Sequence, residues 1–427
     1  MRDYAKSMAW LARAKQVTPG GASTLSKRSR AYVEGVSPAA YTDAAGCRVR
    51  DVGGQDYTDW CMALCSVPLG YAHPTVTAAV VAAAERGWSA SIPSYLEIAA
   101  AEALMAHIPC AQDNGMCRWV NSGTESSEAA IRVARRVTGK SVILSSGYHG
   151  WTSTFMALQP FREGIPLDYD RMIASFAYND LPSLQRALKA HRGDVAAILL
   201  EPTLYDVPAH GFLEALRELA TKHKALLIFD EIVTLGRWHR GGYQAVCGVT
   251  PDLATLGKSI GNGFPVSALV GPGRYMVKAD CISGTYCGNA MALAAVVATM
   301  KVYDEVPVCW HIAEIGVRLM AGLRQIVTRH GDPSLRVDGQ PQHPRLVWDG
   351  DTDNVRLSTL IQGLALGGVI WHFGGANPCL AHSEWDVARL LKVFELAFAS
   401  IDYGVPLKGL PFGPAFQRDP GAKKEAA

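Results

Sequence analysis

Three short segments of this 427-residue chain have residue types and a spacing that could do chemistry. The first is the small-residue turn Ser122-Gly123-Thr124, which follows an apolar run and precedes a helical pattern. Free backbone N–H groups at the start of a helix favour a phosphate, through hydrogen bonds and the helix dipole. The same residues would also serve as an ordinary helix N-cap with a capping-box partner. The turn alone therefore leaves a phosphate site and a structural cap open.

The second segment ends in an acidic residue, Asp230, at the close of the apolar run ALLIFDE. A carboxylate buried at the end of such a strand needs a cationic partner. The protonated ring nitrogen of a heteroaromatic cofactor is one such partner. A structural role, in which Asp230 caps a loop, is equally open.

The third segment contains Lys258, between the apolar run DLATLG and the glycine-rich sequence Gly261-Asn262-Gly263. A lysine among residues that pack rather than solvate has a lowered pKa, and its amine can then form a Schiff base with a carbonyl compound. The alternative is a surface lysine whose stem lies along apolar residues while its amine stays in water.

The elements that would position these residues alternate between helix and strand. Helices are expected over 74–86, 126–138 and 213–223, and strands over 142–145, 196–200 and 225–229. This alternation predicts an α/β fold in which apolar strands form a mainly parallel sheet buried on both faces. Ligands of such sheets bind beyond the carboxyl ends of the strands, where Glu201, Asp230 and Glu231 stand.

After about residue 308 the pattern changes to a smaller α+β unit. It has helices over 311–330, 355–366 and 384–399, a short strand over 368–371 and a Gly/Pro/Asp-rich stretch over 331–354. We therefore expect residues 1–50 to be an N-terminal segment that packs with the small domain, 51–308 to be the large domain, and 309–427 to be the small domain. The tail after about Pro411 is expected to be loosely held.

Composition excludes several classes of protein. Apolar residues make up 49% and charged residues 19%, which is typical of a folded globular chain rather than a disordered one. The 41 basic residues nearly balance the 39 acidic ones, so nucleic-acid binding is not expected. The ten cysteines show no framework spacing or metal-binding pattern, and no signal peptide or membrane span is recognisable. We expect reduced cysteines, no metal site and a cytoplasmic location.

Taken together, six ordered motifs resemble those of the class III, fold type I, pyridoxal-phosphate-dependent aminotransferases. They are NSGTESSEAAIRVAR, YHGW, the Glu201-Pro202 pair, LLIFDEIVT, PDLATLGKSIGNGFPVSALVG and GTYCGNAMALAA. Within the family the chain is most similar to the branch of glutamate-1-semialdehyde 2,1-aminomutase and its relatives. The motifs extend from about Pro19 to Ala294. The resemblance implies a fold type I transferase with a large domain, a smaller α+β domain and pyridoxal 5'-phosphate as cofactor.

The resemblance also implies roles for individual residues. Lys258 would hold the cofactor as a Schiff base and move the proton between substrate and cofactor, and Asp230 would keep the ring nitrogen protonated. Thr285 would reach the phosphate from a neighbouring subunit, which implies a homodimer with shared active sites. The cofactor-binding set would be Ser122, Gly123, Thr124, Tyr148, His149, Glu201, Asp230, Ile232, Lys258 and Thr285. In that set, Tyr148 would stack on one face of the ring and Ile232 would pack on the other. A histidine in such a turn is more often a packing residue, so His149 stays open between the two roles.

Two departures from the family concern the substrate. Val233 stands where many members have a glutamine, which favours the aminomutase-like branch. An N-terminal arginine of that branch is associated with the substrate carboxylate, and here Lys27 lies opposite it, with Arg28 next to it. Lysine and arginine are not equivalent for carboxylate recognition. We therefore expect a small-molecule substrate other than the haem precursor of the aminomutase.

The reaction type has two candidates. The first is an aminotransferase or aminomutase that moves an amino group on a small amino, keto or aldehyde compound. The second is a decarboxylase or racemase on the same scaffold, because Lys258, Asp230 and a phosphate site would serve any carbanion at the substrate's α-carbon.

Overall fold

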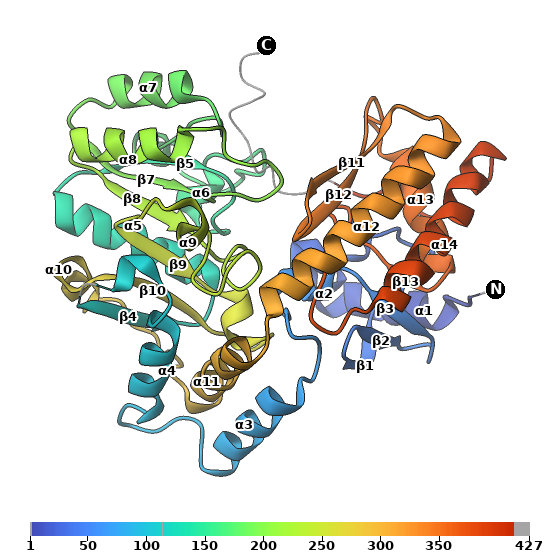
Figure 1. Cartoon of the computed structure of the whole chain (residues 1–427), viewed down its shortest axis with the longest axis horizontal. Coiled ribbons are helices and arrows are strands. Elements are labelled where there is room, and N and C mark those ends of the chain that lie inside the picture. Colours follow the sequence, from blue (N-terminus) through green and yellow to red (C-terminus); the bar gives the residue numbers. More distant parts are fainter. Residues whose placement is uncertain (1, 113, 414–427) are drawn as a thin grey trace. The chain divides into compact units, whose positions relative to one another are not determined.

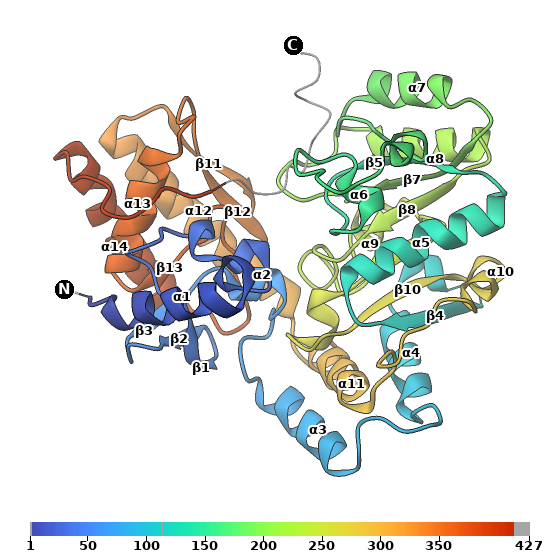
Figure 2. The same ribbon diagram turned by 180° about the vertical axis from the view of Figure 1, so that it is seen from behind.

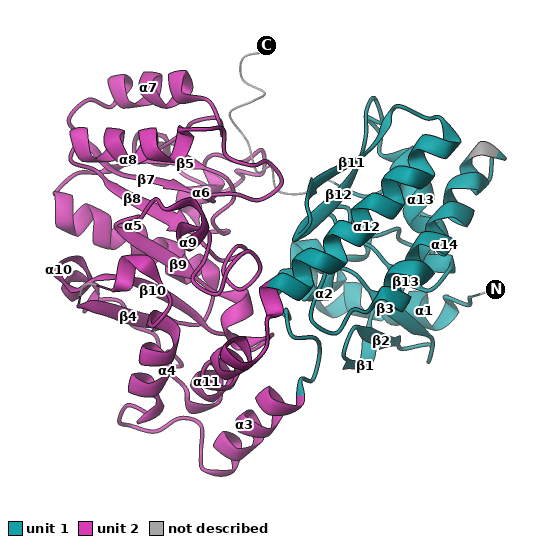
Figure 3. Cartoon of the chain, viewed as in Figure 1, with its two compact units in different colours: residues 1–73, 310–415 teal, residues 74–309, 416–427 magenta. Residues whose placement is uncertain are grey.

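The chain divides into two compact units in the computed structural model, which describes residues 2–112 and 114–413 (Figure 3). The first unit takes the chain up to His73 and again from Trp310 onward, and the second runs from Pro74 to Cys309. The boundary expected at residue 50 lies instead after His73. The reason is that strands β2 (Arg48–Asp51) and β3 (Asp56–Asp59) pair with strands of the first unit.

The second unit is built on a seven-stranded sheet with the order β4-β10-β9-β8-β7-β5-β6 (Figure 1). Strand β10 (Ser267–Pro272) is antiparallel to both of its neighbours, and the other six strands share one direction. These six are β4 (Gly115–Val120), β5 (Val142–Ser146), β6 (Ile173–Ser175), β7 (Val195–Leu200), β8 (Leu226–Asp230) and β9 (Leu253–Leu256). The predicted α/β fold with a mainly parallel sheet is confirmed.

Apolar strand residues of this sheet alternate between two cores, one on each face. Ile143 and Ile228 belong to the core that contains helix α5 (Gly123–Thr138), which covers one face (Figure 2). Leu144 and Leu227 belong to the core on the other face, under helices α7 (Leu181–Ala190) and α8 (Phe212–Lys222). Burial on both faces explains why the strands read as continuous apolar runs.

Further helices complete the second unit. Helices α3 (Pro74–Glu85) and α4 (Leu96–Met105) pack against α11 (Ala290–Glu305). The short elements of this unit are α6 (Ser153–Met156), α9 (Gln244–Cys247), α10 (Gly273–Met276), η4 (Pro109–Ala111), η5 (Leu167–Arg171), η6 (Lys258–Gly261) and η7 (Val277–Ala279).

The first unit combines a small sheet with long helices. Its sheet has the order β1-β2-β3-β13, with β1 at Tyr41–Ala45 and β13 at Val369–Ile370. One core joins Trp60 and Trp371 to apolar residues of the helices. The helices of this region are α1 (Ala5–Val17), α2 (Met62–Cys65), α12 (Val308–His330), α13 (Val355–Leu366) and α14 (Glu384–Asp402), with the turns η1 (Pro19–Gly21), η2 (Leu25–Lys27) and η3 (Ser29–Ala31).

The end of the described chain is attached to this unit. The backbone N–H of Leu410 donates to the carbonyl oxygen of Glu34, and that of Gly413 donates to the carbonyl oxygen of Arg30, both at 2.9 Å. Phe412 is buried. The tail expected to be loose after Pro411 is therefore fixed as far as residue 413, and its remainder lies outside the described residues.

The Gly/Pro/Asp-rich stretch at 331–354 contains a β-hairpin that the sequence pattern did not predict. Strands β11 (Leu335–Gln340) and β12 (His343–Trp348) pair antiparallel, with Gly339 opposite Pro344. Along β11 the charged residues Arg336 and Asp338 alternate with the apolar residues Leu335 and Val337, so this strand reads as polar even though one face is buried.

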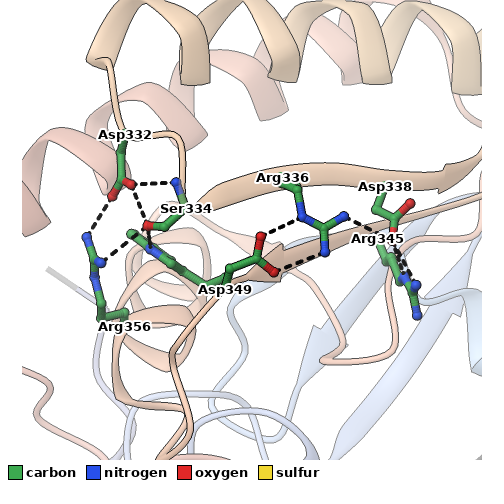
Figure 4. A network of polar contacts seen from close by, with 8 residues as sticks. Asp332, Ser334, Arg336, Asp338, Arg345, Asp349 and Arg356 are labelled. Atoms are coloured by element: carbon green, nitrogen blue, oxygen red, sulfur yellow. Dashed lines mark hydrogen bonds and ion pairs between the residues drawn. The ribbon is translucent and has the colours of Figure 1, made fainter. Parts of the chain in front are cut away.

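Cross-strand ion pairs join the two strands of this hairpin (Figure 4). Arg336 donates from Nε and from one terminal nitrogen to the carboxylate of Asp349, at 2.7 and 3.0 Å. Arg345 donates in the same way to Asp338, at 3.0 and 2.7 Å. Pairs of opposite charge across a strand pair favour this register.

Three further features bear on function. Among the described residues no single helix is long and apolar enough to cross a membrane. Helices α11 and α12 together reach the required length and apolar character, but they are bent by 71° relative to each other. The same residues contain no group of three metal-binding side chains. All ten cysteines are free, and only Cys281 is exposed.

Candidate active site

The predicted site residues of the second unit gather at the carboxyl ends of its parallel strands. Because these strands share one direction, their carboxyl ends lie at one edge of the sheet, where α/β proteins bind ligands. Ser122, Gly123 and Thr124 follow β4; Tyr148 and His149 follow β5; Glu201 follows β7; Asp230 ends β8, with Ile232 after it; and Lys258 follows β9.

Asp230 and His149 form a buried pair between two of these strand ends. The carboxylate oxygen Oδ2 of Asp230 lies 2.6 Å from Nδ1 of His149, and the two side chains are 3% and 1% exposed. The other oxygen, Oδ1, accepts a hydrogen bond from the backbone N–H of Ile232 at 3.1 Å. The imidazole and a backbone donor therefore fix the orientation of the carboxylate.

Both ring nitrogens of His149 face hydrogen-bond acceptors. Nε2 lies 3.0 Å from the carbonyl oxygen of Ser146, which can only accept, so Nε2 carries a proton. Nδ1 is the ring nitrogen that faces the carboxylate of Asp230. His149 is thus a polar partner of Asp230 and does more than fill space in the turn.

Helix α5 begins close to the end of β8. Ser122 is its N-cap and accepts a hydrogen bond from the N–H of Glu125 at 3.3 Å, while the carboxylate of Glu125 accepts from the N–H of Asn121 at 2.7 Å. A Cβ atom at Gly123 would lie 2.6 Å from Cδ1 of Ile232, so glycine permits this close approach. The structural cap is present, and it leaves the first backbone N–H groups of the helix available to a ligand.

The loop after β5 approaches Thr124 and Glu201 closely through two glycines with positive φ. At Gly150 (φ 122°) a Cβ would lie 2.7 Å from Oγ1 of Thr124, and at Gly147 (φ 110°) a Cβ would lie 2.9 Å from Oε2 of Glu201. The N–H of Tyr148 donates to the same oxygen at 3.5 Å. This loop therefore brings Thr124, Tyr148 and Glu201 together.

Lys258 has an unusual backbone conformation. Its φ is 45°, in the left-handed region that residues other than glycine and asparagine rarely adopt, and its side chain is half-buried. The preceding Gly257 passes so close to its neighbours that a Cβ would lie 2.4 Å from Oγ of Ser267 and 3.6 Å from Cγ1 of Ile232. Strain of this kind collects at functional sites, where it fixes the direction of a side chain.

Glu231 has a structural role, although its position after β8 put it among the acids expected to meet a ligand. Its carboxylate is fully buried and accepts hydrogen bonds from the N–H groups of Tyr243, at 2.7 Å, and Gln244, at 3.0 Å. Burial raises its pKa, against the opposing effect of these hydrogen bonds and that of Thr234. Glu231 thus anchors the start of α9.

The remaining predicted residues lie in other parts of the chain. Thr285 is exposed in the turn between η7 and α11, and the amide of Asn121 donates to Sγ of Cys287 in the same turn at 3.5 Å. Lys27 and Arg28 belong to the first unit. Arg28 packs on Gly20, where a Cβ would lie 2.6 Å from its Nε, whereas Lys27 lines a cavity of the first unit.

Sequence reasoning missed the hydrogen-bond pairing of His149 with Asp230 and the cavity of the first unit. The close spacing of glycines in SSGYHGW could have indicated that the loop after β5 approaches its neighbours. The pairing itself joins side chains 81 positions apart, and no local pattern reports such a contact.

Comparison with known proteins places this geometry in a family. The model of the class III aminotransferases matches residues 31–355. The chain belongs to this family. A glutamate-1-semialdehyde 2,1-aminomutase of Syntrophomonas wolfei is 33% identical over 426 residues, covering 92% of this chain and 97% of that protein. A 3-aminobutyryl-CoA aminotransferase of Cloacimonas acidaminovorans is 34% identical over 411 residues, covering 93% and 97%.

A solved structure agrees with the same assignment. The FumI protein of Sphingopyxis sp. MTA144, in its pyridoxal-phosphate internal aldimine form, superposes with a TM-score of 0.87 at 27% identity, over 94% of this chain and 98% of that one. The resemblance recognised in the motifs is confirmed, as is the fold type I architecture. This class III aminotransferase is an enzyme that transfers or shifts an amino group, and its cofactor is pyridoxal phosphate.

Proposed function

We propose that Lys258 is the covalent attachment point of pyridoxal phosphate and that Asp230 is the counter-ion of its ring nitrogen. The observation that carries this proposal is the buried Asp230–His149 pair at the same sheet edge as Lys258. A buried carboxylate held by an imidazole and a backbone N–H suits a cationic ring nitrogen. When bound, the cofactor supplies an electron sink for negative charge at the substrate carbon.

Lys258 has a second role in this proposal. After the substrate amine has replaced Lys258 on the cofactor, the Nζ of Lys258 can remove a proton from the substrate carbon and return it at a neighbouring atom. The left-handed backbone at Lys258 limits the directions in which this amine can reach. We assign the attachment and the proton transfer to this one residue.

The other residues at the sheet edge would hold the cofactor in place. The N–H groups at Gly123 and Thr124 and the hydroxyls of Ser122 and Thr124 offer donors to a phosphate at the start of α5. Tyr148 would stack on one face of the ring and Ile232 would pack on the other, with Glu201 supporting the loop that carries Tyr148. The close approach of Ile232 to Gly123 supports its part in this arrangement.

A homodimer with shared sites would complete each site through Thr285. The second unit exposes a set of large apolar side chains, which we call the 88–98 surface: Trp88, Ile92, Tyr95 and Ile98 are 54%, 76%, 72% and 68% exposed. The carbonyl oxygen of Trp88 accepts from the N–H of Ala290 at 2.9 Å, so the Thr285 turn is attached to this surface. Large apolar side chains exposed over so short a segment are typical of subunit interfaces.

Lys27 is the candidate for an anionic group of the substrate. We favour it over Arg28 because Lys27 lines a cavity, whereas Arg28 packs on Gly20. We also propose a cytoplasmic location, which the ten free cysteines support.

Borohydride reduction followed by peptide mapping tests the attachment point. The cofactor should be fixed on Lys258 in the parent protein and should be lost in Lys258→Ala. A matched control is Lys189→Ala, an exposed lysine on α7, which should keep the label on Lys258. Label on any other lysine of the parent would refute the assignment.

A panel of amino acids then identifies the reaction. A donor that converts the cofactor to its amine form, followed by release of a keto product, indicates transfer. Migration of the amino group within one compound indicates an aminomutase. Release of carbon dioxide, or loss of optical activity without transfer, would favour the decarboxylase or racemase instead.

The shared site is tested by mixing two variants that each damage a different part of the site. Lys258→Ala chains mixed with Thr285→Val chains place both changes in one site of the heterodimer and leave the other site intact. Recovered activity supports Thr285 acting across an interface, and a fully active monomer by light scattering rules it out.

A further inference from the structure

Two arginine side chains of the first unit meet above a glycine. Gly368 lies in the turn between α13 and β13 and has a φ of 83°. A Cβ atom at this position would lie 2.2 Å from Nη2 of Arg2 and 3.3 Å from Nη2 of Arg389. Both nitrogens are thus within 3.3 Å of one point, and the two guanidinium groups are direct neighbours. The segments that carry them, the start of the chain and helix α14, belong to the same unit (Figure 3).

Arg2 is held in this place by contacts with strand β3. Its Nη2 donates to the carbonyl oxygen of Asp56 at 2.8 Å. Its guanidinium carbon lies 4.1 Å from the centre of the ring of Tyr57, which is buried. A cation above an aromatic face is attracted to the ring. Within residues 2–112 and 114–413 these contacts orient the guanidinium but use only one of its N–H groups as a donor.

Arg389 has fewer contacts still. It is half-buried on α14 and forms no hydrogen bond or ion pair with any residue that the structure describes. Its guanidinium carbon lies 5.5 Å from the centre of the ring of Trp385, whose side chain is 60% exposed. A charged donor that is partly removed from water normally has an acceptor, because desolvation without one costs free energy. The N–H groups of Arg389 are therefore available to a ligand.

Three acids stand next to these arginines in the sequence or in the fold, and each has another partner. The carboxylate of Asp56 accepts from Arg50 with both oxygens, at 2.8 and 3.1 Å. Asp386 is bound by Arg48 and also accepts within the cap of α14. Asp3 accepts from a backbone N–H of α1 at 2.9 Å. None of the three forms an ion pair with the two arginines that meet at the glycine.

The end of α13 gives a partial reason for the gathering of positive charge. The last carbonyl groups of this helix carry a partial negative charge that favours nearby cations. In the described chain, however, none of these carbonyl groups accepts a hydrogen bond from Arg2 or Arg389. A fraction of a charge does not balance two full ones. Two like charges at this separation repel each other, and an anion placed between them replaces the repulsion by attraction.

We propose that Arg2 and Arg389 form a binding site for a phosphate group, either free or as part of an ester. A phosphate carries nearly two negative charges, and its oxygens accept charge-assisted hydrogen bonds from two guanidinium groups at once. Trp385 lies beside Arg389 and offers an exposed ring to the organic part of an aromatic ester. The site lies within the first unit and uses no residue of the candidate active site.

Calorimetric titration of the holoenzyme tests the proposal, because the cofactor then occupies its own phosphate site. Inorganic phosphate should bind at about millimolar concentration, and acetate, with one charge, at least tenfold more weakly. Phenyl phosphate distinguishes the two sources of the group. Tighter binding of phenyl phosphate that Trp385→Ala removes identifies an aromatic ester, whereas equal binding of the two probes identifies free phosphate. Acetate binding as tightly as phosphate, or no binding of phosphate well above millimolar concentration, would overturn the proposal.

Variants locate the site. Arg2→Gln and Arg389→Gln should each weaken phosphate binding about tenfold, since each removes a charged donor. Arg389→Lys keeps the charge but loses the planar pair of donors, so its affinity should lie between those of the parent and Arg389→Gln. The matched control is Arg329→Gln, an exposed arginine of α12 that pairs with Glu395 at 3.0 Å, and it should bind phosphate like the parent.

Thermal unfolding separates a binding role from a structural one. Phosphate should raise the unfolding midpoint of the parent and of Arg329→Gln, because a ligand that binds only the folded chain stabilises it. It should raise the midpoint of Arg389→Gln much less. A purely structural arginine would lower the midpoint of the variant without changing its response to phosphate. Parent-like phosphate binding by both Arg2→Gln and Arg389→Gln would refute the site.

Discussion

Acid should destabilise the first unit through His382. This histidine is buried, and its hydrogen bonds in the folded protein fit only the neutral imidazole. Its ring stacks on Trp60 with a centroid distance of 4.0 Å and an interplanar angle of 21°. Nε2 donates to the carbonyl oxygen of Asp59 at 3.1 Å, and Nδ1 accepts from the N–H of Cys379 at 3.1 Å. A second proton would sit on Nδ1, facing that N–H donor. Burial lowers the pKa of His382 from 6.5 to about 3.

The magnitude follows from the difference between these two pKa values. In the unfolded chain the imidazole takes up a proton as the pH falls through about 6.5, whereas in the folded chain it stays neutral to about pH 3. The unfolded state therefore binds more protons in this range, and the stability present above pH 6.5 is lost as the pH falls. Each pH unit costs about 1.4 kcal/mol, so lowering the pH from 7 to 5 should cost about 2 kcal/mol at this one residue.

The assay compares denaturant unfolding of the parent and of His382→Gln from pH 7 to pH 5. The amide of glutamine can donate to Asp59 and accept from Cys379 without titrating, so the variant should lose about 2 kcal/mol less stability over this range. NMR of the parent should show no titration of the His382 ring above pH 5. A midpoint near pH 6.5, or equal pH dependence in the two proteins, would refute the reasoning.

Three further predictions concern the second unit and the hairpin. Asp230→Asn should retain cofactor, seen by its absorbance, but should turn over roughly 10²-fold more slowly or worse, because the ring nitrogen loses its anion; parent-like turnover would contradict the role. Gly150→Ala should cost about 1–3 kcal/mol in denaturant unfolding, because its φ is 122° and the new Cβ meets Thr124; the control Gly164→Ala, with φ 79° and open space around it, should cost less. Arg336→Gln should cost little stability and should reduce, but not remove, the salt dependence of hairpin stability, since both partners are half-exposed and the Arg345–Asp338 pair remains; a large loss of stability would show that the pair does more than brace the surface.

The repetitive part of the fold was predictable from sequence because local patterns determine it. Helix α13 begins and ends at the expected residues, and strand β7 begins one residue before the expected start. These elements have an apolar period or an uninterrupted apolar run, so the local sequence pattern indicates which of their residues are buried. The β11–β12 hairpin was missed because its register depends on ion pairs such as Arg336–Asp349, which join residues 13 positions apart.

The candidate site was predicted for a different reason. Composition and spacing alone left Lys258, Asp230 and the Ser122 turn open between chemical and structural roles, and only the family motifs favoured the chemical roles, which stay a prediction. Where the motifs gave no information, the prediction was weaker. Glu231 was placed with the acids that meet a ligand, but it serves α9, because its direction depends on the N–H groups of Tyr243 and Gln244.

A left-handed backbone marks several of the candidate site residues more clearly than their polarity does. Of the eleven non-glycine residues with positive φ in the described chain, four are asparagines, which tolerate this conformation. Of the other seven, Ala63 and Leu64 line the first-unit cavity with Met62 and Cys65 on either side of them, Lys258 is at the candidate active site, and Ala72 and Lys224 belong to neither. A lysine, a methionine or a leucine carries no local signal for a left-handed backbone, so sequence patterns cannot reveal these positions. Tertiary contacts must enforce the conformation, as the Asp59 carboxylate does for the turn at 62–65. The residues that sequence reasoning finds hardest to place are therefore the ones whose geometry most restricts what can bind.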